Sequence, residues 1–137
     1  MSGKYFLDTN IVIYAYSDID LKKQQIAQTL IDNELAFIST QVLQEIANTF
    51  SKKYKKDWLD IEKILHELID GNIVNKNSEQ TVLEAGQISA ASKYSFYDSL
   101  IISAAIECQC SILYSEDMHD GHILDNKIMI INPFKEL

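Results

Sequence analysis

The chain has 137 residues, of which 47% are hydrophobic and 23% charged, and its net charge is −8. This composition excludes an intrinsically disordered chain, and the length suits a single domain, which we expect to span residues 1–137. The acidic balance argues against a protein that coats nucleic acid with a basic surface, but clustered carboxylates that hold divalent cations would contribute to the same negative count.

Short apolar runs alternate with helical patterns along the whole chain. Runs of three or four apolar residues predict strands, and apolar residues at intervals of three and four predict helices. Ser39 or Thr40 can cap the third helix, and Ser78 opens the fifth in the manner of a capping box with Thr81. In chain order we predict a strand over 5–7, helices over 10–16 and 21–31, a strand over 35–38, helices over 39–50 and 57–69, a strand over 72–74, helices over 78–91 and 96–108, and strands over 112–114 and 128–131.

The predicted strands are continuous apolar runs and do not alternate between apolar and polar residues. Strands of this kind, separated by helices, are typical of a parallel sheet that is covered on both faces. We therefore predict an α/β fold, a three-layer α/β/α sandwich with a central, mainly parallel sheet. Such folds place their ligand sites at the carboxyl ends of the strands.

Acidic residues follow two of the predicted strands directly. Asp8 comes straight after the strand over 5–7, and Glu116 and Asp117 follow the strand over 112–114 with one serine between. Taken alone, Asp8 could cap the next helix, and Asp117 could belong to an ordinary loop. Together they lie where an α/β sheet places its chemistry.

Two further acids lie on helices near the same edge of the predicted sheet. Asp98 precedes Ile101 and Ile102 by three and four residues, so it shares a helix face with core residues, where an uncompensated carboxylate is costly. Glu45 lies in a polar strip beside the apolar stripe of its helix, with Gln41 nearby. Asp98 could instead favour the positive helix end, and Glu45 could simply be solvated. These separate explanations give no reason for all four acids to occur at such positions.

Four converging carboxylates repel one another and raise one another's pKa unless a cation occupies the site. Ligand sets made of oxygen atoms suit Mg²⁺ or Mn²⁺, which keep several waters and bridge to a phosphate. One or two such ions can activate a water for in-line attack and stabilise the leaving oxygen. The sequence therefore predicts a divalent metal site that acts on a substrate phosphate.

Four segments together resemble the PIN domain, and more narrowly the VapC-type toxins of toxin–antitoxin pairs. They are Leu7-Asp8-Thr9-Asn10, Ser39-Thr40-Gln41-Val42-Leu43-Gln44-Glu45, Tyr97-Asp98-Ser99-Leu100-Ile101-Ile102, and Leu113-Tyr114-Ser115-Glu116-Asp117. The resemblance covers nearly the whole chain. It implies a PIN-like fold, an Mg²⁺- or Mn²⁺-dependent endoribonuclease activity, an RNA substrate, a homodimer and a cognate antitoxin protein.

Carried over by position, the resemblance makes Asp8, Glu45, Asp98 and Asp117 the metal-binding and catalytic acids. It gives Thr9, Asn10 and Ser115 the role of small polar residues that support them. The fourth acid stays open at this point, because Asp120 and Glu116 lie in the same predicted loop as Asp117. We favour Asp117, with Asp120 second and Glu116 third.

Several other features have two interpretations. The basic residues Lys52, Lys53, Lys55 and Lys56 could follow an RNA backbone, or could be a solvated helix end. His119 and His122 match no zinc spacing. We expect Tyr94 and Tyr97 to be packing residues and not platforms on which bases stack.

The N-terminal residues lack the apolar stretch of a secretion signal, and no apolar run approaches the roughly 18 residues of a membrane span. We therefore expect a cytoplasmic protein with no membrane partner. Cys108 and Cys110 are one residue apart, a spacing that would strain a disulfide, so we expect reduced thiols.

Three other functions would also suit an α/β domain with acids at its strand ends. A receiver-like phosphoacceptor domain requires a lysine at the end of the last strand, where Asn132 stands, and Lys135 is too late. A haloacid-dehalogenase-type phosphatase requires an aspartate two residues after Asp8, and Asn10 occupies that position. The third alternative is a PIN-like RNA-binding module whose catalytic site is degenerate.

Overall fold

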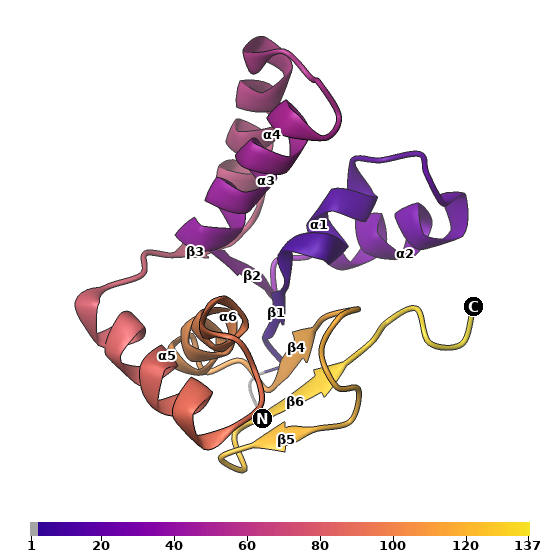
Figure 1. The fold of residues 1–137 in the computed structure, drawn as a ribbon. Coiled ribbons are helices and arrows are strands. Elements are labelled where there is room, and N and C mark those ends of the chain that lie inside the picture. Colours follow the sequence, from indigo (N-terminus) through magenta and orange to yellow (C-terminus); the bar gives the residue numbers. More distant parts are fainter. Residues whose placement is uncertain (1–2) are drawn as a thin grey trace.

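The computed structural model describes residues 3–137, in which six strands form one sheet and six helices flank it (Figure 1). The strands are β1 (Tyr5–Leu7), β2 (Ala36–Ser39), β3 (Ile73–Asn75), β4 (Ile112–Tyr114), β5 (Ile123–Leu124) and β6 (Ile128–Ile131). The helices are α1 (Thr9–Ala15), α2 (Leu21–Ile31), α3 (Thr40–Lys52), α4 (Trp58–Gly71), α5 (Glu79–Ala91) and α6 (Phe96–Glu107).

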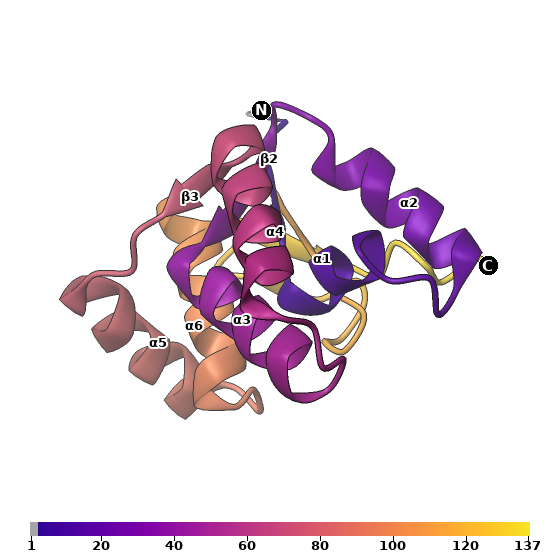
Figure 2. The ribbon, with the colours of Figure 1, turned by 90° about the horizontal axis from the view of Figure 1, so that it is seen from above.

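The strand order is β3-β2-β1-β4-β6-β5, and every neighbouring pair is parallel except β5 with β6. Helices α1 and α2 lie on one side of the sheet, and α5 and α6 lie on the other, as two perpendicular views agree (Figures 1 and 2). The predicted three-layer α/β/α sandwich with a mainly parallel sheet is therefore confirmed. In register, Leu7 pairs with Tyr114, so the residues that follow β1 and β4 emerge side by side.

The central strands are buried from both faces, which explains their continuous apolar sequence. Phe6 and Leu7 of β1 and Leu113 of β4 are fully buried. Helix α6 packs between α5 and the sheet, and its residues from Ser99 to Ala105 are all buried. An all-round buried helix has no polar stripe, so α6 shows little amphipathic pattern in its sequence.

Several helix and strand boundaries differ from the predicted ones by one or two residues, and one strand was not predicted. Helix α1 begins at Thr9 and not at residue 10, because the Asp8 carboxylate accepts a hydrogen bond from the Thr9 amide and caps it. Strand β5 was not predicted, since two residues give no periodic signal. It joins β6 by a tight turn in which Asp125 and Asn126 both have φ 52°, and the Lys127 amide donates to the Leu124 carbonyl over 2.9 Å.

Helices α3 and α4 pack against each other and extend beyond the sheet (Figure 1). Ser39, at the end of β2, caps α3, so the chain passes directly from the sheet into this helix. Glu45 is thereby placed above the carboxyl edge of the sheet. No helix within residues 3–137 is long and apolar enough to cross a membrane.

Candidate active site

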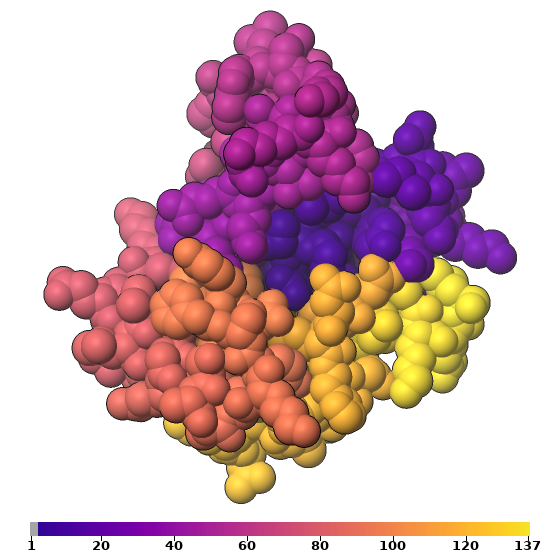
Figure 3. All heavy atoms as spheres, viewed as in Figure 1, coloured from indigo at the N-terminus to yellow at the C-terminus, as the bar shows by residue number. Residues whose placement is uncertain are grey.

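One cavity of about 210 Å³ lies at the carboxyl ends of β1 and β4 and brings four acids together. In the space-filling view a hollow opens between α3, α6 and the segment after β4, with the indigo N-terminal residues at its floor (Figure 3). Parallel strands end at the same edge, which is why acids so far apart in sequence meet here. The carboxylates that line the cavity are Asp8, Glu45, Asp98 and Asp117.

Asp8 is the buried member of this set, with 6% of its surface exposed. One carboxylate oxygen accepts the Thr9 amide at 2.7 Å, and the other accepts the Ser115 hydroxyl at 2.8 Å. Ser115 is itself fully buried and follows β4 as Asp8 follows β1. Two strands and a helix N-terminus therefore fix the orientation of this carboxylate.

Burial raises the pKa of Asp8 to about 7, because removal from water disfavours the charged form. The hydrogen bonds from Ser115 and Thr9 lower its pKa, but the charges of Asp98 and Glu45 raise it further. The pKa of Asp98 is raised as well, first by burial and then by the charge of Asp117. The cavity thus concentrates negative charge that no protein cation neutralises among the residues lining it.

Thr9 orients the second acid. Its hydroxyl donates to the Glu45 carboxylate over 2.6 Å, which links α1 to α3 across the cavity. Thr9 is 9% exposed, so this hydrogen bond is shielded from water. Since the same residue donates its amide to Asp8, Thr9 holds two of the four acids in fixed positions.

Replacing Thr9 with valine keeps the side-chain shape and removes the hydroxyl. We expect this variant to lose about tenfold in metal affinity or activity, because a partner that orients a ligand carboxylate contributes about that much. Titration of Mn²⁺ followed by thermal shift would measure the affinity. Thr29→Val, at an exposed position on α2, is the matched control. Equal affinities in the two variants would contradict an orienting role for Thr9.

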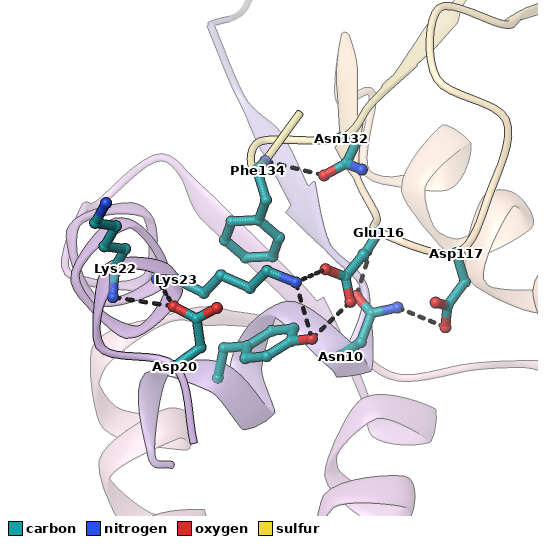
Figure 4. Close-up of polar contacts among 9 residues, drawn as sticks. Asn10, Asp20, Lys22, Lys23, Glu116, Asp117, Asn132 and Phe134 are labelled. Atoms are coloured by element: carbon teal, nitrogen blue, oxygen red, sulfur yellow. Dashed lines mark hydrogen bonds and ion pairs between the residues drawn. The ribbon is translucent and has the colours of Figure 1, made fainter. Parts of the chain in front are cut away.

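Asp117 reaches the cavity from the loop after β4, and Asn10 fixes it there. The Asn10 side-chain amide donates to the Asp117 carboxylate over 2.9 Å, and its carbonyl oxygen accepts the Glu116 amide over 3.4 Å (Figure 4). Asn10 therefore bridges the first turn of α1 to this loop. These contacts join residues separated by more than a hundred positions in the sequence.

The other two candidates for the fourth acid point elsewhere. Glu116 accepts the Tyr14 hydroxyl at 2.7 Å and pairs with the Lys23 ammonium, away from the cavity (Figure 4). Asp120 accepts the Asn132 amide at 2.7 Å and the Lys135 ammonium at 2.9 Å. Of the three acids, Asp117 is the one that lines the cavity.

The basic residues of the α3 terminus lie to one side of the acids. Lys53 lines a second cavity of about 320 Å³ that shares Asn10 and Asp117 with the acidic one. Lys52 and Lys55 are exposed, and the Lys56 ammonium lies 5.5 Å from the centre of the Phe50 ring. Lys53 therefore lines the same second cavity as Asp117, one of the four acids.

The donor set fits a hydrated hard cation. Within residues 3–137 no three acidic, histidine or cysteine side chains converge closely enough to hold one ion directly. Mg²⁺ keeps several waters and is commonly held by one or two carboxylates, which suits acids spread around a cavity of this size. The buried Asp8, with its raised pKa, is the carboxylate that such a cation would stabilise most.

Four residues that line the cavity were not predicted as site residues: the apolar Ile13 and Ile101, and the polar Gln41 and Tyr97. Tyr97 is 65% exposed, so the expectation that it is a packing residue is wrong, whereas Tyr94 is half-buried and hydrogen-bonds His122. Gln41 is 4% exposed, and its side-chain nitrogen donates to the Tyr97 carbonyl over 3.1 Å. The sequence held a signal for each of the two polar residues, because Gln41 lies one helical turn before Glu45 and Tyr97 precedes Asp98.

Solved structures share this fold. A toxin–antitoxin complex from Klebsiella pneumoniae aligns with a TM-score of 0.71 at 16% identity, covering 96% of this chain and 98% of that one. VapBC2 from Rickettsia felis, bound to a promoter DNA fragment, aligns with a TM-score of 0.63 at 23% identity. The alignment covers 82% of this chain and 87% of that one. VapC20 of Mycobacterium tuberculosis, a toxin that cleaves the sarcin–ricin loop, aligns with a TM-score of 0.63 at 14% identity. The alignment covers 83% of this chain and 90% of that one.

A comparison with curated protein sequences gave no match. The sequence does match the PIN domain family over residues 5–119, which includes β1, the acidic cavity and the loop after β4. The matched segment is most of the chain, and it contains all four acids. The protein belongs to the PIN domain family.

Proposed function

We propose that this protein is an Mg²⁺- or Mn²⁺-dependent endoribonuclease and the toxin of a toxin–antitoxin pair. The observation that carries the proposal is the convergence of Asp8, Glu45, Asp98 and Asp117 on one cavity, with Asp8 buried and no cationic side chain in the lining. Membership of the PIN domain family and the likeness to toxin–antitoxin complexes support the same assignment. We further propose a cytoplasmic protein that forms a homodimer and is held inactive by an antitoxin.

The four acids would hold the cation beside an RNA phosphate. When bound, Mg²⁺ or Mn²⁺ supplies an activated water and stabilises the leaving oxygen. The protein itself holds the carboxylates in place: Ser115 and the Thr9 amide orient Asp8, the Thr9 hydroxyl orients Glu45, and Asn10 orients Asp117. A cation held by carboxylates in fixed positions would supply this chemistry without reorganisation of the protein.

Cleavage of RNA by the purified protein tests the proposal. We expect endonucleolytic products with Mn²⁺ or Mg²⁺ and none with EDTA, because without a cation no positive charge in the cavity lining offsets the negative charge of the acids and the phosphate. Cleavage in EDTA would contradict metal dependence. Metal binding without cleavage of any RNA would instead favour a degenerate RNA-binding module.

A matched pair of variants in the loop after β4 tests the fourth acid. Asp117→Asn should lower the cleavage rate at least about thirtyfold, since it removes a carboxylate from the cavity. Asp120→Asn should stay within about threefold of the wild type, because Asp120 pairs with Lys135 and the Asn132 amide outside the cavity. The reverse ranking would show that Asp120 is the functional acid.

A further inference from the structure

Besides the four acids, the cavity is lined by two polar residues that have no role in the proposed chemistry. Gln41, on α3, and Tyr97, at the start of α6, line it, and the Gln41 amide nitrogen donates to the Tyr97 carbonyl. Their contact joins the two helices that flank the hollow. Gln41 is buried, whereas Tyr97 is exposed.

Gln41 presents an acceptor that has no donor. Because its nitrogen faces the Tyr97 carbonyl, the amide orientation is fixed, and the remaining atom is the oxygen Oε1. That oxygen is buried and has no hydrogen-bond partner. Two other buried polar atoms in residues 3–137 lack partners, on Asn72 and Ser99, and neither residue lines the acidic cavity. An orphaned acceptor is costly, so this one points to a donor on a ligand.

Tyr97 presents an aromatic surface. The residue is 65% exposed, and its ring contacts that of Phe96 edge to face, with ring centres 5.5 Å apart and planes at 75°. The hydrogen bond from Gln41 also holds the backbone of Tyr97. A large and open ring next to a phosphate-binding cavity can stack on an unpaired base.

We propose that Gln41 and Tyr97 form a nucleotide subsite that reads one unpaired ribonucleotide next to the scissile phosphate. This inference rests on the proposed ribonuclease function. Tyr97, which is exposed, stacks on the base, and Gln41 Oε1, which the incoming nucleotide uncovers by a small shift of the atoms that enclose it, accepts a hydrogen bond from the 2′-hydroxyl of the same nucleotide. The sugar is the part of a nucleotide nearest its phosphate, which is why the buried acceptor beside the acids is assigned to the ribose and the exposed ring to the base.

The subsite requires a single-stranded segment of RNA, because a base that is paired in a duplex cannot stack on a protein ring. It also supplies a physical basis for preferring RNA over DNA, since only RNA carries the hydroxyl that satisfies Gln41. Both consequences can be measured separately from the cleavage chemistry.

Steady-state kinetics on an unstructured RNA test the stacking role. Tyr97→Leu should raise KM about tenfold with kcat within about threefold, as expected for the loss of one stacked base. Tyr97→Phe keeps the ring and should stay within about twofold of the wild type. The high exposure of Tyr97 means that neither variant should compromise folding.

A set of otherwise identical RNA oligonucleotides, each with 2-aminopurine at one position, gives a direct readout of stacking. In an Asp8→Asn background, to prevent cleavage, one position next to the scissile phosphate should lose fluorescence on binding. Adding Tyr97→Phe should keep this quenching, and adding Tyr97→Leu should abolish it. Quenching that survives Tyr97→Leu, together with an unchanged KM, would overturn the stacking assignment.

A double-mutant cycle tests the 2′-hydroxyl. One 2′-deoxy substitution at the nucleotide beside the cleaved bond should slow wild-type cleavage about tenfold, and should have no further effect in Gln41→Met. Gln44→Met, at an exposed position of the same helix, is the control and should keep the tenfold effect. Equal deoxy effects in wild type and Gln41→Met would overturn the ribose assignment.

The experiments distinguish a wrong nucleotide subsite from a wrong ribonuclease function. If the wild type cleaves RNA but neither Tyr97 nor Gln41 variants behave as stated, the subsite is wrong and the ribonuclease function stands. If the wild type neither cleaves nor binds RNA with Mn²⁺ present, the proposed function falls and this inference falls with it.

Discussion

Replacing Asp8 with asparagine is expected to lower the RNA cleavage rate at least about a hundredfold. Asp8 is the most deeply buried of the four acids and is held by donors on both carboxylate oxygens, so no neighbouring acid can move into its place. Losing a carboxylate that holds a catalytic cation removes several kcal/mol of transition-state stabilisation, and about 2.7 kcal/mol corresponds to a hundredfold. Single-turnover cleavage with saturating Mn²⁺ would measure the rate of the chemical step.

The matched control is Asp70→Asn, at an exposed position near the end of α4. It makes the same change in net charge far from the cavity, and its cleavage rate should equal that of the wild type. Circular dichroism should show the same fold in both variants. If Asp8→Asn retained more than a tenth of the wild-type rate, Asp8 could not be a principal metal ligand.

The same substitution should stabilise the metal-free protein at alkaline pH. The pKa of Asp8 is about 7 in the folded protein against 3.8 ordinarily, so between these values the folded state keeps a proton that the unfolded state has released. The free energy of unfolding therefore falls as the pH rises from about 4 to about 7, by about 2 to 4 kcal/mol. Asparagine carries no such penalty, since it does not ionise.

Thermal unfolding in EDTA between pH 5 and pH 8 would measure this effect. The melting temperature of the wild type should fall by several degrees relative to that of Asp8→Asn as the pH rises. Mn²⁺ at pH 8 should restore the wild type by neutralising the carboxylates, and should leave Asp8→Asn largely unchanged. Parallel pH profiles for the two proteins in EDTA would show that the Asp8 carboxylate is not destabilised by burial.

The sequence was sufficient to predict the fold class and the region of the site. Strands such as Tyr5–Leu7 are buried on both faces, so their uninterrupted apolar character by itself indicates a parallel sheet. Asp8 and Asp117 follow such strands, and the carboxyl edge of a parallel sheet is where such residues meet. The pattern of apolar residues in a strand indicates the type of sheet, because it reflects which faces of the strand are buried.

The tertiary structure was needed to distinguish among acids that the sequence left equivalent. Glu116 and Asp117 are neighbours, yet Lys23, 93 positions from Glu116, draws Glu116 away from the cavity, while Asn10, 107 positions from Asp117, holds Asp117 at it. These pairs have no local signature, because partners so distant in sequence meet only when the sheet has formed. The same reason applies to Gln41 and Tyr97, whose contact depends on how α3 and α6 approach each other.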